Sequence, residues 1–224
     1  MPAAGIALKM LLNLHAVKVA DRAAIQRQTE NQQTSVSVLR STYTFTKAHN
    51  LMNTTISISA ETTDMYETEN DIPLLRRTAI NILMNQQLAS AIDLQLQLKQ
   101  AHWNVKGPNF IGLHELFDKV SEAIEPYVDM IAERIVQLGG IAEGTVRGAA
   151  ARSRLTEYPS SIGDGSAHVE AVSRALSTFG YESRNTITEA NELEDAVTAD
   201  LFTEVTRGID KWLWFVEAHS QASK

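Results

Sequence analysis

From Asp71 onward, apolar residues recur at intervals of three and four, which is the spacing of one face of an α-helix. Four such stretches follow one another, and turn-forming residues separate them. We therefore expect four long helices. Their apolar stripes are Leu75, Ala79, Ile82, Ala89, Ile92 and Leu96; Phe110, Leu113, Phe117, Val120, Ile124, Val128, Ile131, Ile135 and Leu138; Val169, Val172, Leu176 and Phe179; and Val197, Leu201, Val205, Ile209, Trp212 and Val216.

Glycine and proline residues mark the expected helix ends. Pro73 suits the first turn of the first helix, which should end near Asn104, just before Gly107-Pro108. The pair Gly139-Gly140 should close the second helix as a C-cap. Pro126 lies inside the second helix, where we expect it to kink the helix or remove one backbone hydrogen bond.

The second and third helices are separated by a long connection over residues 141–163, in which we expect a short helix. Two helices joined by a short turn, a long crossing, and two more helices joined by a short turn describe a four-helix bundle with one long crossover. This topology is all-α and ferritin-like. We place the bundle at residues 71–220, after an extension over residues 1–70 and before a short tail over residues 221–224.

The N-terminal extension is rich in Ser, Thr, Gln and Asn from about residue 26, and its alternating runs are too short and polar to form a core. Three interpretations stay open: a mobile extension, a transit-type presequence, and a segment that is seldom made because translation starts at Met52 or Met65. A secretory signal is not expected, because polar residues interrupt the apolar stretch near the start. No long apolar run occurs, so we expect a cytoplasmic protein with no membrane partner.

The formal net charge of −7 is unevenly distributed along the chain. Residues 1–60 carry six basic and two acidic residues, a net charge of +4, and the rest of the chain has a net charge of −11. The acidic part should attract cations and repel nucleic acid. The chain contains no cysteine, so any metal site must be built from His, Asp and Glu.

Two pairs of metal-binding residue types lie on the second helix, each four residues apart: His114 with Asp118, and Asp129 with Glu133. At about 100° per residue these positions fall at roughly 0, 40, 60 and 100°, so they share one polar edge. Asp118 and Asp129 are nevertheless about 16 Å apart along the helix axis, which is too far to bind one ion. Two antiparallel copies of the helix remove the difficulty, so the spacing predicts an intersubunit site.

His102, at the end of the first helix, is expected to complete this site, because the short turn brings it near the start of the second helix. The simpler interpretation of this single residue is a core or interface histidine bonded to a backbone carbonyl. Two imidazoles and three carboxylates form a mixed set of nitrogen and oxygen ligands, which suits iron, manganese or zinc.

The residues around these candidates form a specific set of motifs. They are Lys99-Gln100-Ala101-His102-Trp103-Asn104-Val105-Lys106-Gly107, then Phe110, His114 and Phe117-Asp118, then Asp129-Met130-Ile131-Ala132-Glu133-Arg134, and finally Trp212-Leu213-Trp214-Phe215-Val216-Glu217. Over about residues 71–219 the chain resembles the Dps family, the dodecameric mini-ferritins. The resemblance implies a hollow dodecamer with two irons at each intersubunit site. It assigns His102, His114 and Asp118 to one subunit and Asp129 and Glu133 to its two-fold partner.

The same resemblance implies a ferroxidase that oxidises Fe(II), commonly with hydrogen peroxide and otherwise with oxygen, and stores the ferric mineral, which protects against oxidative damage. Trp103 is a candidate electron donor beside the first ligand, with interface packing as the alternative. Iron enters such shells through acidic three-fold pores. Asp195, Asp200 and Glu204 resemble that lining, with Asp200 as the best candidate; the alternative is that carboxylates favour a helix N-terminus.

Other functions stay open beside this one. An ordinary ferritin subunit carries Glu-x-x-His pairs around its own di-iron site, and this chain has no such pair. The same ligand set accepts zinc, so a metal-binding shell without oxidase activity is one alternative. The other is a DNA-binding shell that protects the nucleoid, in which the +4 charge of the extension, repeated over many tails, binds phosphate in a salt-sensitive way.

Overall fold

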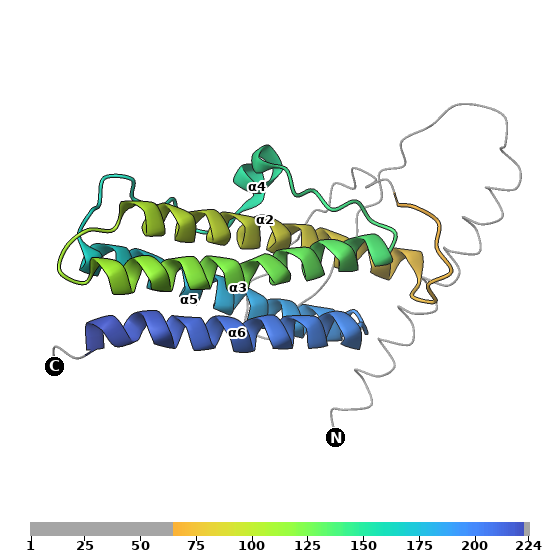
Figure 1. The fold of residues 1–224 in the computed structure, drawn as a ribbon. Helices are drawn as coiled ribbons and strands as arrows, with labels where there is room; N and C mark the ends of the chain where they lie inside the picture. Colours follow the sequence, from red (N-terminus) through yellow and green to blue (C-terminus); the bar gives the residue numbers. More distant parts are fainter. Residues whose placement is uncertain (1–64, 222–224) are drawn as a thin grey trace, which may run out of the picture. The chain divides into compact units, whose positions relative to one another are not determined.

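The structure, a computed structural model, describes residues 65–221. These residues form five helices and no strand (Figure 1): α2 (Leu74–Asn104), α3 (Phe110–Gln137), α4 (Val146–Arg152), α5 (Gly165–Glu192) and α6 (Ala196–Gln221). Residues 1–64 and 222–224 lie outside the described part, so the interpretations of the N-terminal extension stay predictions. No helix among residues 65–221 is long and apolar enough to cross a lipid bilayer.

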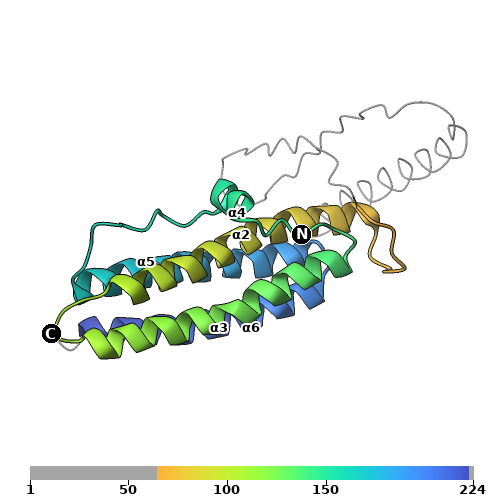
Figure 2. The same ribbon diagram turned by 45° about the horizontal axis from the view of Figure 1, so that its top comes forward.

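The four long helices lie side by side as two pairs, α2 with α3 and α5 with α6 (Figure 1 and Figure 2). A short turn joins the helices of each pair, which are therefore antiparallel. Arg77 near the start of α2 donates a 2.9 Å hydrogen bond from Nη1 to the carbonyl oxygen of Leu138, directly after α3. The long connection returns along α2 and contains α4. The predicted ferritin-like bundle with one long crossover is confirmed, including the short helix in the crossover.

The hydrophobic core lies between the four long helices. Phe117 from α3, Phe179 from α5 and Phe202 from α6 are among its largest fully buried side chains. Burying a side chain of this size contributes roughly 1.5–3 kcal/mol. The stripes predicted for α3 and α5 supply a large part of this core, through Leu113, Phe117, Val120, Ile124, Ile131, Ile135, Leu138, Val169, Val172, Leu176 and Phe179.

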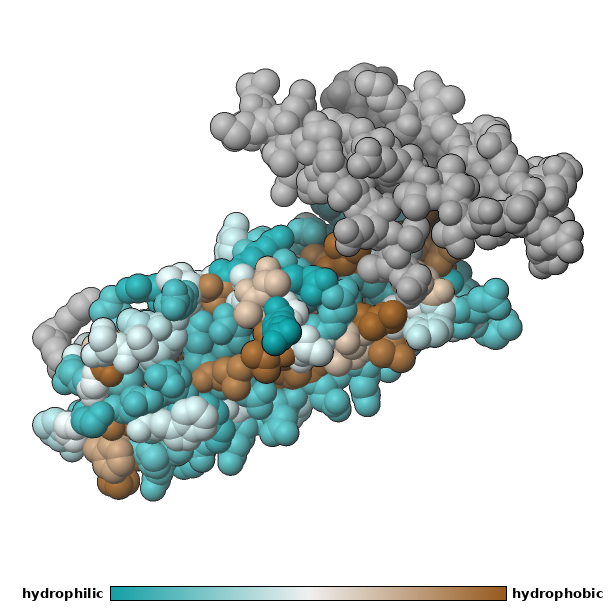
Figure 3. All heavy atoms as spheres, turned by 90° about the horizontal axis from the view of Figure 1, so that it is seen from above, coloured by the Kyte–Doolittle hydropathy of each residue, from teal (hydrophilic) through white to brown (hydrophobic). Residues whose placement is uncertain are grey.

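The stripe predicted for α2 is wrong as the core face. Ile82 and Leu96 are 41% and 48% exposed, whereas Ala89 is buried because the connection around α4 crosses α2 there. The helix is apolar on two faces, so its periodicity did not show which one packs inward. Figure 3 shows the face that includes α2 and α4, where apolar patches alternate with polar surface. Val197 at the start of α6 is also exposed, and the core side of α2 is Ile80, Met84, Leu88, Ala91, Leu94 and Leu98.

The C-terminus of α3 has the predicted glycine cap. Gly139 has a φ of +81°, a conformation that glycine adopts at little cost. Its N–H donates to the carbonyl of Val136 and the N–H of Gly140 donates to the carbonyl of Ile135, both at 2.9 Å. These two bonds form a Schellman motif. Upstream, α3 continues through Pro126 as one helix, so this proline removes a backbone donor without ending the helix.

Candidate metal centre

His102 in the last turn of α2 and His114 in the second turn of α3 form a stacked pair. Their ring centroids lie 3.8 Å apart and the ring planes differ by 23°. The Nδ1 atom of His102 lies 2.8 Å from the carbonyl oxygen of His114, and the Nδ1 atom of His114 lies 2.8 Å from the carbonyl oxygen of His102. A carbonyl only accepts, so each Nδ1 carries a proton, and in the neutral form of each ring the lone pair of Nε2 is left for a metal.

The local sequence explains why these reciprocal bonds form. The carbonyl of His102 lies in the last turn of α2, where backbone oxygens have no donor within their own helix. Gly107, with a φ of +107°, allows the tight turn that brings the start of α3 beside that end. His114 therefore satisfies an orphan carbonyl and is itself oriented. The backbone-bonded histidine and the metal ligand, which were alternatives for His102 from the sequence, are compatible.

Asp118 lies one turn after His114, and its Oδ1 is 4.0 Å from Nε2 of His102. The ammonium of Lys99 forms an ion pair with the same carboxylate. The hydrogen bond from Lys99 lowers the pKa of Asp118 more than desolvation raises it, and the positive charge of Lys99 acts in the same direction as the hydrogen bond. The carboxylate is therefore ionised, as a metal ligand must be. Lys99 is not among the residues predicted for the site from the sequence, although its position one turn before His102 was a usable signal.

Asp129 and Glu133 lie further along α3, exposed to solvent. The structure thus brings His102, His114 and Asp118 together and leaves these two carboxylates apart from them. Among residues 65–221, no group of three or more His, Asp or Glu side chains is arranged to hold a metal ion by itself. Trp103 follows His102 and is 66% exposed. A role for it as an electron donor stays a prediction.

Of the three acidic residues assigned to an iron pore, Asp195 has a different role. It is 2% exposed, and its two carboxylate oxygens lie 2.9 and 3.0 Å from Nη2 of Arg134. It also accepts a 3.1 Å hydrogen bond from the backbone N–H of Thr198, and it is therefore the N-cap residue of α6. Within the subunit Asp195 is therefore used at a helix N-terminus, as the alternative interpretation expects, and its pore assignment stays an untested prediction. Asp200 and Glu204 are exposed on α6.

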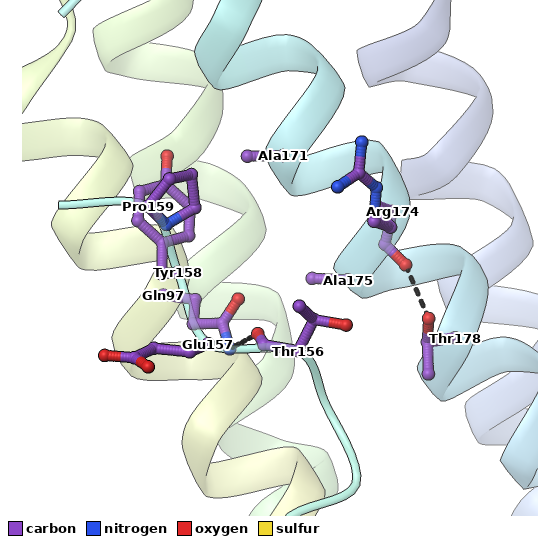
Figure 4. Close-up of a pocket in the computed structure, with 9 residues that line it drawn as sticks. All are labelled: Gln97, Thr156, Glu157, Tyr158, Pro159, Ala171, Arg174, Ala175 and Thr178. Carbon is purple, nitrogen blue, oxygen red and sulfur yellow. Dashed lines mark hydrogen bonds between the residues drawn. The ribbon is translucent and has the colours of Figure 1, made fainter. Parts of the chain in front are cut away.

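A second polar group sits between the crossover and α5. The hydroxyl of Tyr158 lies 2.6 Å from Nδ1 of His168, which is fully buried at the start of α5. Burial lowers the pKa of His168 and raises that of Tyr158, so both are neutral at pH 7. Figure 4 shows the small pocket beside Tyr158, and none of the five predicted ligands lines it. Its walls are Gln97, Thr156, Glu157, Tyr158, Pro159, Ala171, Arg174, Ala175 and Thr178.

Comparisons with known proteins agree on one family. The profile of the ferritin-like domain matches residues 82–223. The DNA protection during starvation protein of Agrobacterium fabrum is 41% identical over 156 residues, which cover 70% of this chain and 96% of the relative. The solved structure of DpsA14 from Streptomyces coelicolor matches with a TM-score of 0.65 and 34% identity, covering 70% of this chain and 92% of the other. A Dps structure from Vibrio cholerae, at 20% identity and a TM-score of 0.65 over 70% of this chain and 98% of the other, shares the fold.

Proposed function

Because the chain belongs to the Dps family of ferritin-like proteins, we propose that it is a ferroxidase and iron store. It oxidises Fe(II) at sites shared between two subunits and keeps the ferric product inside a hollow dodecamer. The observation that carries this proposal is the stacked histidine pair, whose two Nε2 atoms are left for a metal beside the ionised Asp118. A histidine pair with only a packing role has no need of a carboxylate next to its free nitrogens.

The second half of each site comes from the partner in this proposal. Asp129 and Glu133 are exposed on the same edge of α3 as His114 and Asp118. In an antiparallel pair of α3 helices they face the histidine end of the other subunit. The combined set of two imidazoles and three carboxylates takes two Fe(II) ions as substrates. The Vibrio cholerae Dps is described as a member of a broad superfamily of ferritin-like diiron-carboxylate proteins, which supports this ligand type.

The reaction follows from the ligand chemistry. Each Fe(II) gives up one electron, the O–O bond of hydrogen peroxide breaks, and the two electrons reduce the peroxide to two hydroxide ions. Carboxylate oxygens are hard ligands and favour the Fe(III) product over the Fe(II) substrate. Taking both electrons in one encounter avoids hydroxyl radical. Trp103, next to His102 in the sequence, is our candidate donor of the second electron when only one iron is bound.

The test is anaerobic loading of the purified oligomer with Fe(II), followed by a peroxide pulse. We expect about one peroxide consumed per two irons, with the iron retained in a dodecamer-sized peak on size exclusion. His114→Ala and Asp129→Ala should abolish the acceleration, and His219→Ala, a matched exposed histidine on α6, should not. An intact oligomer that leaves Fe(II) unoxidised and binds zinc or manganese would replace the ferroxidase with an inert metal shell.

Iron uptake is assigned to the exposed carboxylates of Asp200 and Glu204 on α6. Their exposure in the single subunit is what an acidic channel between subunits requires. Replacing both with the matching amides should slow iron uptake at low Fe(II) concentration and leave the rate at saturating Fe(II) unchanged. An equal loss at all concentrations would argue against an uptake role.

A second function, DNA binding in the cytoplasm or nucleoid, is supported by the name of the relatives and by the +4 charge of residues 1–60. Binding of this kind is electrostatic and falls steeply with salt. A gel-shift series from low to moderate salt, with the full chain and a chain lacking residues 1–60, tests it. Equal DNA retention by both chains would remove the extension from this role.

A further inference from the structure

The hydrogen-bonded pair of Tyr158 and His168 lies inside the subunit and is not part of the predicted ligand set. The hydroxyl of Tyr158 is 2.6 Å from Nδ1 of His168, and the two rings stack with their centroids 6.0 Å apart. His168 is fully buried and Tyr158 is half-buried. Because a phenol is more acidic than the N–H of a neutral imidazole, the hydroxyl donates and Nδ1 accepts.

The segments that carry these two residues are both fixed by hydrogen bonds. The Nε2 atom of Gln97 on α2 donates a 3.1 Å hydrogen bond to the carbonyl of Thr156, two residues before Tyr158 in the crossover (Figure 4). His168 lies in the first turn of α5, where its backbone N–H donates a 3.1 Å hydrogen bond to the carbonyl of Asp164. The packing of the crossover on α2 and α5 therefore keeps the phenol and the imidazole together.

A third buried ring connects this pair with the metal centre. The ring of Phe117 lies 6.5 Å from that of His168, centroid to centroid, and Phe117 directly precedes Asp118 on α3. Protein interiors are packed without large gaps, and an electron tunnels more readily through such contacts than across open space. The rings of Tyr158, His168 and Phe117 thus form a packed row that ends next to a predicted ligand.

We propose that Tyr158 is the final source of the second electron when only one iron occupies the site, with His168 as the acceptor of its proton. This inference rests on the proposed function, which supplies the Fe(II) and the hydrogen peroxide. An electron first taken from Trp103 is replaced by one from Tyr158, because the phenol can pass its proton to a base at the same moment.

The electrons and protons of this step balance. Fe(II) gives one electron and Tyr158 gives the other, so the O–O bond of hydrogen peroxide breaks and two hydroxide ions form. The phenol proton moves to Nδ1 of His168, which leaves a neutral tyrosyl radical, an imidazolium and Fe(III). A later Fe(II) returns the electron, the proton moves back to the phenol, and the pair is restored. No hydroxyl radical is released.

His168 makes oxidation possible at a position that is largely shielded from water. Taking an electron from the phenol alone would leave a positive charge on a side chain in an apolar environment, which is costly. Burial lowers the pKa of His168, so the imidazole is neutral and can take up the proton. The carbonyls of Asn104 and Ile162 act in the opposite direction, and they stabilise the imidazolium once it forms.

Two other tyrosines serve as controls. Tyr127 on α3 is also half-buried, but its hydroxyl lies against Gly208, and burial and the charge of Glu204 raise its pKa. Tyr181 on α5 is 61% exposed. Among residues 65–221, neither hydroxyl has a recorded hydrogen bond to an imidazole. Phenylalanine at either position removes a hydroxyl without touching the Tyr158–His168 pair.

The test is electron paramagnetic resonance of the oligomer, loaded with one Fe(II) per site and frozen directly after a peroxide pulse. The unmodified chain should give a tyrosyl radical signal, which ring-deuterated tyrosine narrows. Tyr158→Phe keeps the packing ring and should lose this signal, whereas Tyr127→Phe and Tyr181→Phe should keep it. A spin trap in the same samples should detect more hydroxyl radical from Tyr158→Phe than from the unmodified chain.

A tyrosyl signal that persists in Tyr158→Phe would overturn the proposal, as would equal release of hydroxyl radical by the two chains. Loading with two Fe(II) per site separates this proposal from the ferroxidase. A chain that oxidises two irons per peroxide and forms no radical on Tyr158 at the lower loading keeps the ferroxidase and loses this inference. A chain that leaves Fe(II) unoxidised at both loadings loses the ferroxidase, and with it the oxidant that Tyr158 would reduce.

Discussion

The inner face of α3 packs within the subunit, whereas its outer edge, which carries Asp129 and Glu133, is exposed. Arg134 points inward, is 8% exposed, and binds both oxygens of Asp195. Its neighbour Glu133 is exposed, as is Asp129, and neither makes a hydrogen bond or ion pair recorded among residues 65–221. The same helix therefore has one surface that is packed within the subunit and one that is exposed. Changes to the inner face should alter the stability of the subunit, whereas changes to the outer edge should alter chemistry and association.

Removing a ligand from the outer edge should have the largest effect. His114→Ala and Glu133→Ala should each slow Fe(II) oxidation by about 100-fold or more, because orienting partners alone are commonly worth 10–100-fold. Stopped-flow absorbance of the ferric product measures the rate. Glu133→Ala should leave the free energy of unfolding of the subunit unchanged. His114→Ala should lower it by about 1 kcal/mol, because the carbonyl of His102 loses its donor.

Co-expression of these two variants tests whether each site takes residues from two subunits. Each mixed pair of subunits holds one site with both substitutions and one intact site. Random pairing makes half of the pairs mixed, so about a quarter of the wild-type activity should return. A site contained within one subunit predicts no recovery at all.

Asp195→Asn should produce the largest change on the inner face. It breaks a buried ion pair and leaves Arg134 without its anion, which should cost about 3 kcal/mol in urea unfolding. Burial raises the pKa of Asp195, but hydrogen bonds from Thr198 and Arg134 outweigh it, so the pKa lies below its ordinary value. The stabilisation is therefore complete above the ordinary aspartate pKa of about 4 and is lost as the pH falls below it.

The control for this change is Asp200→Asn, an exposed aspartate on the same helix, which should shift stability by less than about 0.5 kcal/mol. The difference in the free energy of unfolding between wild type and Asp195→Asn should be constant from pH 6 to 8 and should become smaller below about pH 4. A difference in the free energy of unfolding that grows as the pH falls would contradict the lowered pKa of Asp195.

Ile111→Glu should weaken association of subunits by about 10- to 100-fold, because it adds a charge to the exposed edge of α3 that carries the proposed intersubunit site. The subunit itself should unfold at the same urea concentration, since Ile111 is not part of the core. Analytical ultracentrifugation over a dilution series measures the association, and urea unfolding measures the stability of the subunit. Unchanged association would show that Ile111 lies outside the subunit contact.

The smallest effect is expected at the turn that leads into Asp195. Glu194 has a φ of +57°, in the left-handed region that a side chain disfavours. Glu194→Gly should raise the free energy of unfolding by about 0.5–1 kcal/mol. Its ion pair with Arg76 is largely exposed and offsets little of this gain. Lower stability of the glycine variant in thermal unfolding would show that the ion pair outweighs the strain.

Local sequence determined the helices and the layout of the candidate ligands. Periodicity placed the four long helices, the length of the connection indicated the short helix within it, and Gly139-Gly140 ends α3 as expected. The spacing of Asp118 and Asp129 along one helix already excluded a single-subunit site. These features depend on repeats within one helix and on turn chemistry, both of which are written in neighbouring residues.

Tertiary packing decided which surfaces those helices present and what their polar groups bind. It selected one of two apolar stripes on α2, took Asp195 into an ion pair with Arg134, and brought Lys99 to Asp118. It also joined His102 and His114 through each other's carbonyls. Such choices depend on residues far apart in the chain, so no local pattern contains them. The fold therefore brings His102, His114 and Asp118 together within the subunit and leaves Asp129 and Glu133 on the exposed edge of α3.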